Sequence, residues 1–426
     1  MDLVIPLDRP SAEAAESVGP KASRLASLAR AGVPVADGFC IAAEAYRAHL
    51  AAAALTETAR RAAAGDGFDA RRLALDVKLG LLEAPLEPSL QAALVSQWRR
   101  LAGHPPAPVA VRSSALLEDR PGATFAGQFD TFLGIDSEAD FLTAVRGCWA
   151  SLWATRALRY MQAHDVDLAS TAMAVLVQRL VPARSSGGAL SLTPEGSVAL
   201  TGAWGLGSAI AQGEVVPDRF LLDRDGALEV VEPGRKDRLV TWSPERGSHP
   251  RAVAQALVEA PCLDANEAAE LGRIVLAVEA VIGAPVEVEW ALGEGGFVIL
   301  QARPLSVEQP AAPDELWLRH PSLTGQPAGV GHGSGPARIV VHEHDLEHVA
   351  LGEVLVTQIA GPALAAVLNR VAGVVAELGG STSHLAALAR ERGIPAVLGV
   401  RDATRSIPSG ALVAVDGVTG VVRWMR

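Results

Sequence analysis

The hydrophobic pattern as far as residue 304 predicts helices mixed with short strands. Apolar residues at helical spacing follow Gly19-Pro20-Lys21, and two alanine-rich stretches continue the helical pattern. Further on, short apolar runs lie between turns, a pattern typical of strands and hairpins. The first predicted helix begins at residue 19, and further helices are predicted at about 42–64, 73–101 and 266–281. The predicted strands cover 108–112, 129–135, 175–181, 189–192, 198–203, 220–223, 228–231, 286–290 and 296–301.

The composition changes at residues 304–313, which are rich in proline and alanine and form the best candidate for a domain boundary. Beyond them, short valine-rich strands alternate with two helices, which indicates a small second domain. The predicted strands cover 337–341, 353–357, 373–376, 396–398, 412–415 and 420–424, and the helices lie near 362–370 and 384–392. Taken together, the two patterns predict an α/β fold.

One turn in the second part carries candidate chemistry. A hydrophobic run, 371–378, is broken by Gly379-Gly380, and a hydroxyl-rich turn then places His384 where a helix begins. Free amides and the positive end of a helix dipole favour a phosphate at such a position. The same positive end keeps the imidazole neutral, as a nucleophile requires. The alternative is an ordinary helix cap whose histidine only packs or faces water.

Composition narrows the classes of function. The chain has 426 residues, 49% of them hydrophobic, enough for two or three domains with buried cores. Its formal net charge of −11 argues against a general nucleic-acid or anionic-membrane surface. The N-terminus lacks the basic start and long apolar run of a signal peptide, and no apolar stretch approaches about 18 residues. We therefore expect a cytoplasmic protein with no membrane or nucleic-acid partner.

The three cysteines, Cys40, Cys148 and Cys262, lie far apart and form no CxxC pair. This spacing argues against a structural zinc site and predicts buried, reduced thiols. A histidine-rich stretch contains His342, His344 and His348 among acidic residues. His342 and His344 have a spacing that permits chelation, but a solvated loop is the better explanation of the stretch.

Several residues before the boundary suit a nucleotide polyphosphate. Arg112 ends a buried strand, and its planar, permanently charged fork suits phosphate oxygens. Residues 121–128 form a small-residue loop whose amides can approach phosphates closely. Glu287 and Glu289 share one face of a strand, and Gln301 lies on the strand expected to pair with it. Two carboxylates and an amide oxygen suit Mg²⁺ bridging phosphates, although a solvated strand face also explains the carboxylates.

The motifs together resemble a known enzyme group. Residues 19–305 are similar to the ATP-grasp nucleotide-binding domain of the phosphoenolpyruvate synthase, pyruvate phosphate dikinase and rifampin phosphotransferase group, and residues 326–426 to its swivelling phosphohistidine domain. The matching motifs are Gly19-Pro20-Lys21-Ala22, Val111-Arg112-Ser113-Ser114-Ala115, residues 125–131, Trp204-Gly205-Leu206-Gly207, Val216-Pro217-Asp218-Arg219, Glu289-Trp290, residues 300–304, 379–384 and 389–397. The resemblance implies an α+β ATP-grasp domain at 1–305, a linker at 306–325 and a small α/β swivelling domain at 326–426.

The resemblance also implies an ATP-dependent phosphotransferase of the dikinase type. His384 would accept the β-phosphoryl group of ATP after the γ-phosphoryl group has left, giving AMP, phosphate and phosphohistidine, and Arg303 would neutralise charge on the transferred group. ATP and Mg²⁺ are the implied cofactors. The residues implied to bind ATP are Lys21, Arg112, Gly127, Thr131, Gln178, Glu289, Gln301 and Arg303, and those implied to bind Mg²⁺ are Glu289, Gln301 and Glu287.

The sequence departs from the group at several positions. Thr201 and Ser208 stand where glutamates are usual, and the stretch 186–191 is less apolar than its counterpart. Loss of the two carboxylates would weaken ATP binding or alter metal handling. Leu385 follows the histidine where alanine or glycine is usual, and would crowd the approach of an acceptor.

The identity of the acceptor stays open. Residues 306–325 leave no room between the two domains for the acceptor domain that the relatives carry. We therefore expect an acceptor that is a small molecule or is bound by a separate partner protein. Two alternatives remain: a phosphohistidine carrier or regulatory subunit that works only in complex with such a protein, and a nucleotide-binding protein that has lost transfer.

Overall fold

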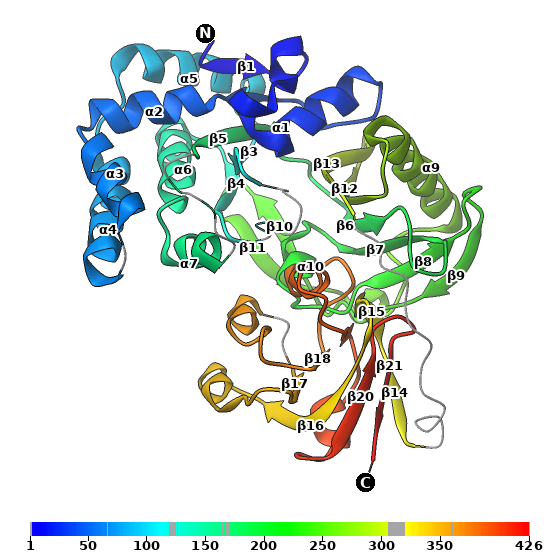
Figure 1. Ribbon diagram of the computed structural model, residues 1–426. Helices are drawn as coiled ribbons and strands as arrows, with labels where there is room; N and C mark the ends of the chain where they lie inside the picture. The colour runs from blue at the N-terminus through cyan, green and yellow to red at the C-terminus, as the bar shows by residue number, and fades with distance from the viewer. Residues whose placement is uncertain are drawn as a thin grey trace. The chain divides into compact units, whose positions relative to one another are not determined.

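The computed structural model describes residues 2–65, 67–118, 125, 127–163, 166, 168, 171–305, 320–358 and 361–425. The chain forms two compact units, each described by itself below. Unit 1 consists of Met1–Val181, Trp242–His249 and Val298–Arg303, and unit 2 of Pro182–Thr241, Pro250–Phe297 and Pro304–Arg426. The α/β class predicted from the sequence is confirmed (Figure 1).

Unit 1 is built on a sheet with the strand order β1-β2-β5-β3-β4. Strand β5 lies at its centre and is buried at every position except its last. Helices α1 and α6 pack on this sheet (Figure 1). The aromatic residues Phe39, Phe141 and Trp149 are buried in the core. The elements of the first part of the chain are β1 (Val4–Pro6), η1 (Pro10–Glu13), α1 (Ala15–Arg30), β2 (Gly38–Ile41), α2 (Ala43–Ala52), α3 (Thr56–Ala64), α4 (Gly67–Glu83), α5 (Pro88–Ala102), β3 (Val109–Ala115), β4 (Thr131–Ile135), α6 (Glu138–Ser151), α7 (Thr155–Ala163) and β5 (Met173–Arg179).

The first sheet of unit 2 has the strand order β12-β6-β7-β8-β9, and the residues of β13, which follows β12 in the chain, are divided between the two units. Its neighbouring strands are antiparallel, so opposed residues share a face. Helix α9 packs on the sheet and begins with a capping box formed by Asp264 and Glu267. The elements between residues 185 and 304 are β6 (Ser185–Leu190), β7 (Val198–Trp204), α8 (Ser208–Ala211), β8 (Asp218–Leu222), β9 (Leu228–Glu232), β10 (Arg238–Ser243), β11 (Gly247–Ala252), η3 (Gln255–Leu257), α9 (Ala265–Ile282), β12 (Val286–Gly293) and β13 (Gly296–Pro304), of which β10 and β11 form a separate two-stranded sheet.

The second sheet of unit 2 has the strand order β14-β21-β20-β16-β17-β18-β19-β15. Its central strands β16, β17, β18 and β19 are parallel, and β17, β18 and β19 are buried along their whole length. Parallel strands covered on both faces require continuous apolar runs, which explains the valine-rich composition. The elements are β14 (Ser322–Thr324), β15 (Gln326–Gly329), β16 (His332–Val340), η5 (Glu343–His348), β17 (Val354–Thr357), η6 (Pro362–Ala366), β18 (Gly373–Ala376), α10 (His384–Glu391), β19 (Ala396–Leu398), α11 (Ala403–Ser406), β20 (Leu412–Asp416) and β21 (Val421–Trp424).

Most predicted elements are confirmed, but three helical predictions were wrong in extent. The stretch 42–64 is two helices, because Ala54 adopts a left-handed backbone with φ of 56° between them. The stretch 73–101 is also two helices, since Pro85 and Pro88 interrupt it. The stretch 362–370 contains only the short 3₁₀ helix η6. Residues 306–319, most of the expected linker, lie outside the described residues.

Two other expectations concern the thiols and the length of apolar segments. Cys40, Cys148 and Cys262 are buried free thiols, as predicted, and burial raises the pKa of Cys40 and of Cys148 to about 12. In the part of the chain that the structure describes, every helix is too short or too polar to cross a bilayer.

Candidate functional site

Lys21 is placed by a kink at the start of α1. Gly19 has φ of 77°, and a Cβ atom there would lie 2.4 Å from Ser114 Oγ and 2.5 Å from Ser114 O, so only glycine fits. After the kink, Lys21 Nζ donates to the carbonyl of Ser113 at 2.9 Å and lies 3.4 Å from a carboxylate oxygen of Glu118. The ammonium therefore lies beside Ser113, the residue that follows Arg112 on β3. Because β3 continues to Ala115, Arg112 lies in the middle of the strand, and the prediction that it ends the strand was wrong.

Arg112, Thr131 and Gln178 share one face of the unit 1 sheet. Arg112 is directly opposite Thr131 on β4, and Gln178 is opposite Ala110, two residues from Arg112 along β3. Gln178 is only 2% exposed, and its Nε2 has no hydrogen-bond partner among the described residues. A buried amide without a partner is costly unless something outside the chain accepts its hydrogen bond.

Gln301 and Arg303 belong to the segment of β13 that lies in unit 1. The backbone amide of Ile299 donates to the carbonyl of Pro34 at 2.8 Å and holds this segment beside the sheet. Arg112 then donates to the carbonyl of Leu300 at 2.9 Å and to Oε1 of Gln301 at 3.1 Å. Five of the predicted nucleotide residues, Lys21, Arg112, Gln178, Gln301 and Arg303, are half-buried or buried in unit 1.

The predicted phosphate loop is described only in part, because residues 121–124 and 126 lie outside the described residues. Phe125 is 2% exposed, and its ring centroid lies 4.6 Å from that of Tyr160 and 5.5 Å from that of Phe129. Gly127 has φ of 69° and is exposed, as is Thr131. The aromatic contacts anchor the loop at Phe125, and the left-handed backbone at Gly127 turns the chain before β4.

In unit 2, Glu287 and Glu289 lie two residues apart on β12 and therefore point to the same face. Glu289 is directly opposite Gly188 on β6, and Gly188 is directly opposite Thr201 on β7. Opposed residues of antiparallel strands share a face, so the two carboxylates and the side chain of Thr201 lie on one side of this sheet. Glu287 is 9% exposed, and Glu289 is half-buried.

His384 is the first residue of α10, as predicted. The hydroxyl of Ser383 caps the helix by accepting from the amide of Ala386 at 3.3 Å. The His384 side chain is half-buried, whereas Leu385 is 2% exposed. The leucine side chain therefore does not stand at the surface beside the histidine, and its effect on the approach of an acceptor stays a prediction.

The turn before His384, residues 379–383, lies over the face that carries the carboxylates. The hydroxyl of Thr382 shares a 2.6 Å hydrogen bond with that of Thr201. A Cβ atom on Gly188 would lie 2.5 Å from Cβ of Thr382, so the glycine leaves the space that Thr382 fills. The amide of Gly379 donates to the carbonyl of Val215 at 3.1 Å. These contacts hold the histidine turn on the same side of the sheet as the two carboxylates.

Two family models match this chain. Residues 15–317 match the model described as the pyruvate phosphate dikinase AMP/ATP-binding domain. The chain belongs to this family. Residues 349–420 match a second model, the mobile domain of PEP-utilising enzymes, which contains the histidine turn and α10.

Individual relatives are similar along nearly the whole chain. The phosphoenolpyruvate synthase of Aeropyrum pernix is 33% identical over 479 residues, covering 99% of this chain and 58% of its own length. A probable phosphoenolpyruvate synthase of Methanothermobacter thermautotrophicus is 32% identical, covering 95% of this chain and 61% of its own length. The chain thus spans about three fifths of these relatives. A D-alanine-D-alanine ligase structure from Coxiella burnetii covers 71% of this chain and 50% of its own at 8% identity and a TM-score of 0.27, from which we infer nothing.

Two contacts in the site were not expected from the sequence. Glu118 pairs with Lys21 and also accepts from the amide of Ala115 at 3.1 Å. Arg390, which belongs to a motif shared with the family, pairs with Glu287 at 2.8 Å. Neither partner could be read from the sequence, because 97 residues separate Lys21 from Glu118 and 103 residues separate Glu287 from Arg390.

The histidine-rich stretch does not gather metal ligands. The rings of His342 and His344 stack with centroids 5.4 Å apart, and within the described ranges no group of three or more histidine, cysteine or acidic residues could hold a metal ion. His332 pairs with Asp416, with 3.3 Å between Nε2 and Oδ1. His342, His344 and His348 are exposed, as expected of a solvated stretch, but residues 343–348 form the 3₁₀ helix η5 in place of the predicted loop.

Proposed function

We propose that this chain is an ATP-dependent phosphotransferase of the dikinase type in which His384 carries the phosphoryl group. The observation that carries the proposal is the position of the turn at 379–383 over the strand face with Glu287 and Glu289. A nucleophile at a helix start on the carboxylate face is suited to attack a phosphate that a metal holds there.

The unit 1 residues support binding of the nucleotide. Lys21 and Arg112 bring two positive charges to the middle of β3, where they would neutralise the oxygens of a polyphosphate. Gln178 offers a buried amide N–H that lacks an acceptor among the described residues. Arg303 lies two positions beyond Gln301, on the same strand face, and would neutralise charge on the phosphoryl group during its transfer.

Glu287 and Glu289 fit a divalent cation, because carboxylate oxygens at spacing two on one face are donors that Mg²⁺ accepts. We propose that Glu289, Gln301 and Glu287 hold it. A bound Mg²⁺ supplies neutralisation of phosphate charge. In the balanced reaction, water attacks the γ-phosphorus and the bond from this phosphorus to the β,γ-bridging oxygen breaks, which releases phosphate. An N–P bond from His384 to the β-phosphorus forms, and the bond from the β-phosphorus to the α,β-bridging oxygen breaks, which releases AMP.

The test is labelling of the whole chain with ATP carrying ³²P at the β position, in the presence of Mg²⁺. We expect acid-labile, base-stable label on the protein and equal amounts of AMP and phosphate, and no label from γ-³²P-ATP. His384→Ala should lose the label while still binding ATP. His344→Ala is the matched control, since that side chain is 76% exposed and lies far along the chain from His384. Undiminished labelling of His384→Ala would refute the assignment.

The acceptor is the second stage of the proposal. The relatives are named phosphoenolpyruvate synthases, so pyruvate is the first acceptor to test with the labelled chain, followed by small alcohols, phenols and sugars. Loss of label to one of these would identify a small-molecule acceptor. Label that remains until a partner protein is added would instead favour a carrier that is discharged in a complex.

A further inference from the structure

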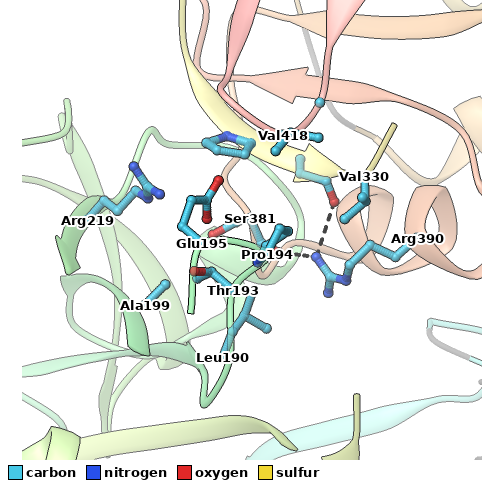
Figure 2. Close-up of a pocket in the computed structure, with 13 residues that line it drawn as sticks. Leu190, Thr193, Pro194, Glu195, Ala199, Arg219, Val330, Ser381, Arg390 and Val418 are labelled. Atoms are coloured by element: carbon cyan, nitrogen blue, oxygen red, sulfur yellow. Dashed lines mark hydrogen bonds between the residues drawn. The ribbon is translucent and has the colours of Figure 1, made fainter. Parts of the chain in front are cut away.

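The guanidinium of Arg390 joins the histidine turn to the carboxylate strand. Its Nη1 donates to the carbonyl of Ser381 at 2.5 Å and to that of Ala328 at 3.2 Å, as the dashed lines in Figure 2 show. Its Nη2 donates to Oε2 of Glu287 at 2.8 Å. Ser381 lies three residues before His384, so a single planar fork holds the backbone of the turn and a carboxylate of the proposed metal site.

This contact is largely sequestered from solvent. The side chains of Arg390 and Glu287 are 12% and 11% exposed, so each would be left as a nearly buried, unbalanced charge without the other. Beside the pair lies a cavity of about 40 Å³ lined in part by Ser381 and Arg390 (Figure 2). The Oγ of Ser381 is buried and has no partner among the described residues, so the backbone carbonyl of Ser381, not its side chain, makes the contact with Arg390.

Other described contacts of the turn are neutral. Gln326 accepts from the amide of Ser381 at 3.4 Å and donates to the carbonyl of Pro217 at 2.7 Å, and Thr382 bonds to Thr201. Arg390 adds a charged contact between α10 and the carboxylate strand. Arg392, which follows the same helix, instead donates to the carbonyl of Ala365 at 2.9 Å.

We propose that Arg390 is the positioning residue for phosphoryl transfer to His384, an inference that rests on the function proposed above. In this role it acts through the turn and not on the nucleotide. It fixes the carbonyl of Ser381 relative to Glu287, and through the turn it fixes the distance between the imidazole and the phosphorus atom. Displacing a nucleophile by about 1 Å costs on the order of 100-fold in rate, so a small release of the turn has a large effect.

The first measurement is hydrogen exchange at the amides of residues 379–383, which needs no ATP. Arg390→Met should exchange at least about 10-fold faster there than the native chain, because the turn loses its charged anchor. Arg392→Met is the matched control and should leave exchange in this segment unchanged. Equal exchange in the two variants would overturn the proposal.

The second measurement is the single-turnover rate of labelling from β-³²P-ATP. We expect a loss of about 10- to 100-fold in Arg390→Met, a smaller loss in Arg390→Lys, and no loss in Arg392→Met, with ATP affinity unchanged in all three. Arg390→Ala should regain rate when guanidinium ion is added at millimolar concentration. An Arg390→Ala variant that stays slow with guanidinium, or an Arg390→Met variant that labels at the control rate, would overturn the proposal. A native chain that takes no label would refute the proposed function instead. The hydrogen-exchange result would still test whether Arg390 anchors the turn at 379–383.

Discussion

Asp218 and Lys236 form an ion pair in unit 2, and the side chains of both residues are fully buried. Oδ1 of Asp218 accepts from Lys236 Nζ and from the amide of Gly234 at 2.7 Å, and Oδ2 accepts from the amide of Cys262 at 2.8 Å. One carboxylate therefore joins β8 to two separate loops. We predict that this residue of the Val-Pro-Asp-Arg motif serves the fold, and the perturbation is Asp218→Asn.

The magnitude follows from what the substitution leaves behind. The asparagine side chain is neutral, so the ammonium of Lys236 would be buried without a counter-charge, and the new amide N–H₂ would face a backbone donor. Removing one partner of a buried ion pair costs about 3–5 kcal/mol, which is roughly 150- to 5000-fold in the folding equilibrium. Lys236→Met should cost less, because two amide donors still stabilise the carboxylate. The double variant should recover part of the loss, since no charge is then buried.

The assay is urea unfolding followed by tryptophan fluorescence, because the free energy of unfolding and its urea dependence come from one curve. The control is Arg60→Met, which removes an ion pair with Glu57 whose side chains are both 66% exposed, and we expect no measurable change there. A loss below about 1 kcal/mol in Asp218→Asn, or a double variant as unstable as the sum of the single variants, would refute the reasoning.

Two other predictions test the core of unit 1. Gly19→Ala should destabilise the chain by about 2–4 kcal/mol, because the backbone there is left-handed and the new Cβ atom would clash with Ser114. Gly32→Ala is the control: Gly32 has φ of 84° and nothing within 4 Å of the new Cβ atom, so only the smaller backbone cost should appear. Thermal unfolding compares the two variants, and equal losses of stability would contradict the clash. Because burial raises the pKa of Cys40 and of Cys148 to about 12, neither thiol should react with a disulfide reagent near about pH 8 until the chain unfolds, and rapid modification of the folded chain would show that they are accessible.

Local signals explain what the sequence could predict. The start of α10 follows from a glycine break, a serine cap and apolar helical spacing, all within ten residues of His384. The valine-rich strands follow from burial on both faces of a parallel sheet. Helix α6 carries comparable signals, a Ser137 cap and apolar residues at Phe141, Val145 and Cys148, and could have been predicted from them.

Contacts between distant parts of the chain could not be predicted in the same way. The pair of Arg390 with Glu287 depends on the register of β12 and on where α10 docks, and neither leaves a local pattern. The placement of Gln301 on Arg112 likewise depends on the hydrogen bond that holds β13 at Pro34, far from both residues in sequence. The residue types indicate the chemistry of these groups but not their partners, because folding brings together charged residues that are far apart in the sequence.

Two departures that the resemblance to the family implies, at Thr201 and in the stretch 186–191, can be understood as one feature of the structure. Thr201 is fully buried, and its hydroxyl lies 2.6 Å from that of Thr382. A glutamate at this position would need the space that Thr382 occupies and would bury a charge beside the neutral turn. Gly188, in the stretch that is less apolar than its counterpart, leaves room for Thr382. The two positions are therefore matched to the histidine turn. The hydroxyl of Thr201 stands where the resemblance implies a carboxylate, and the charge of Glu287 is balanced by Arg390.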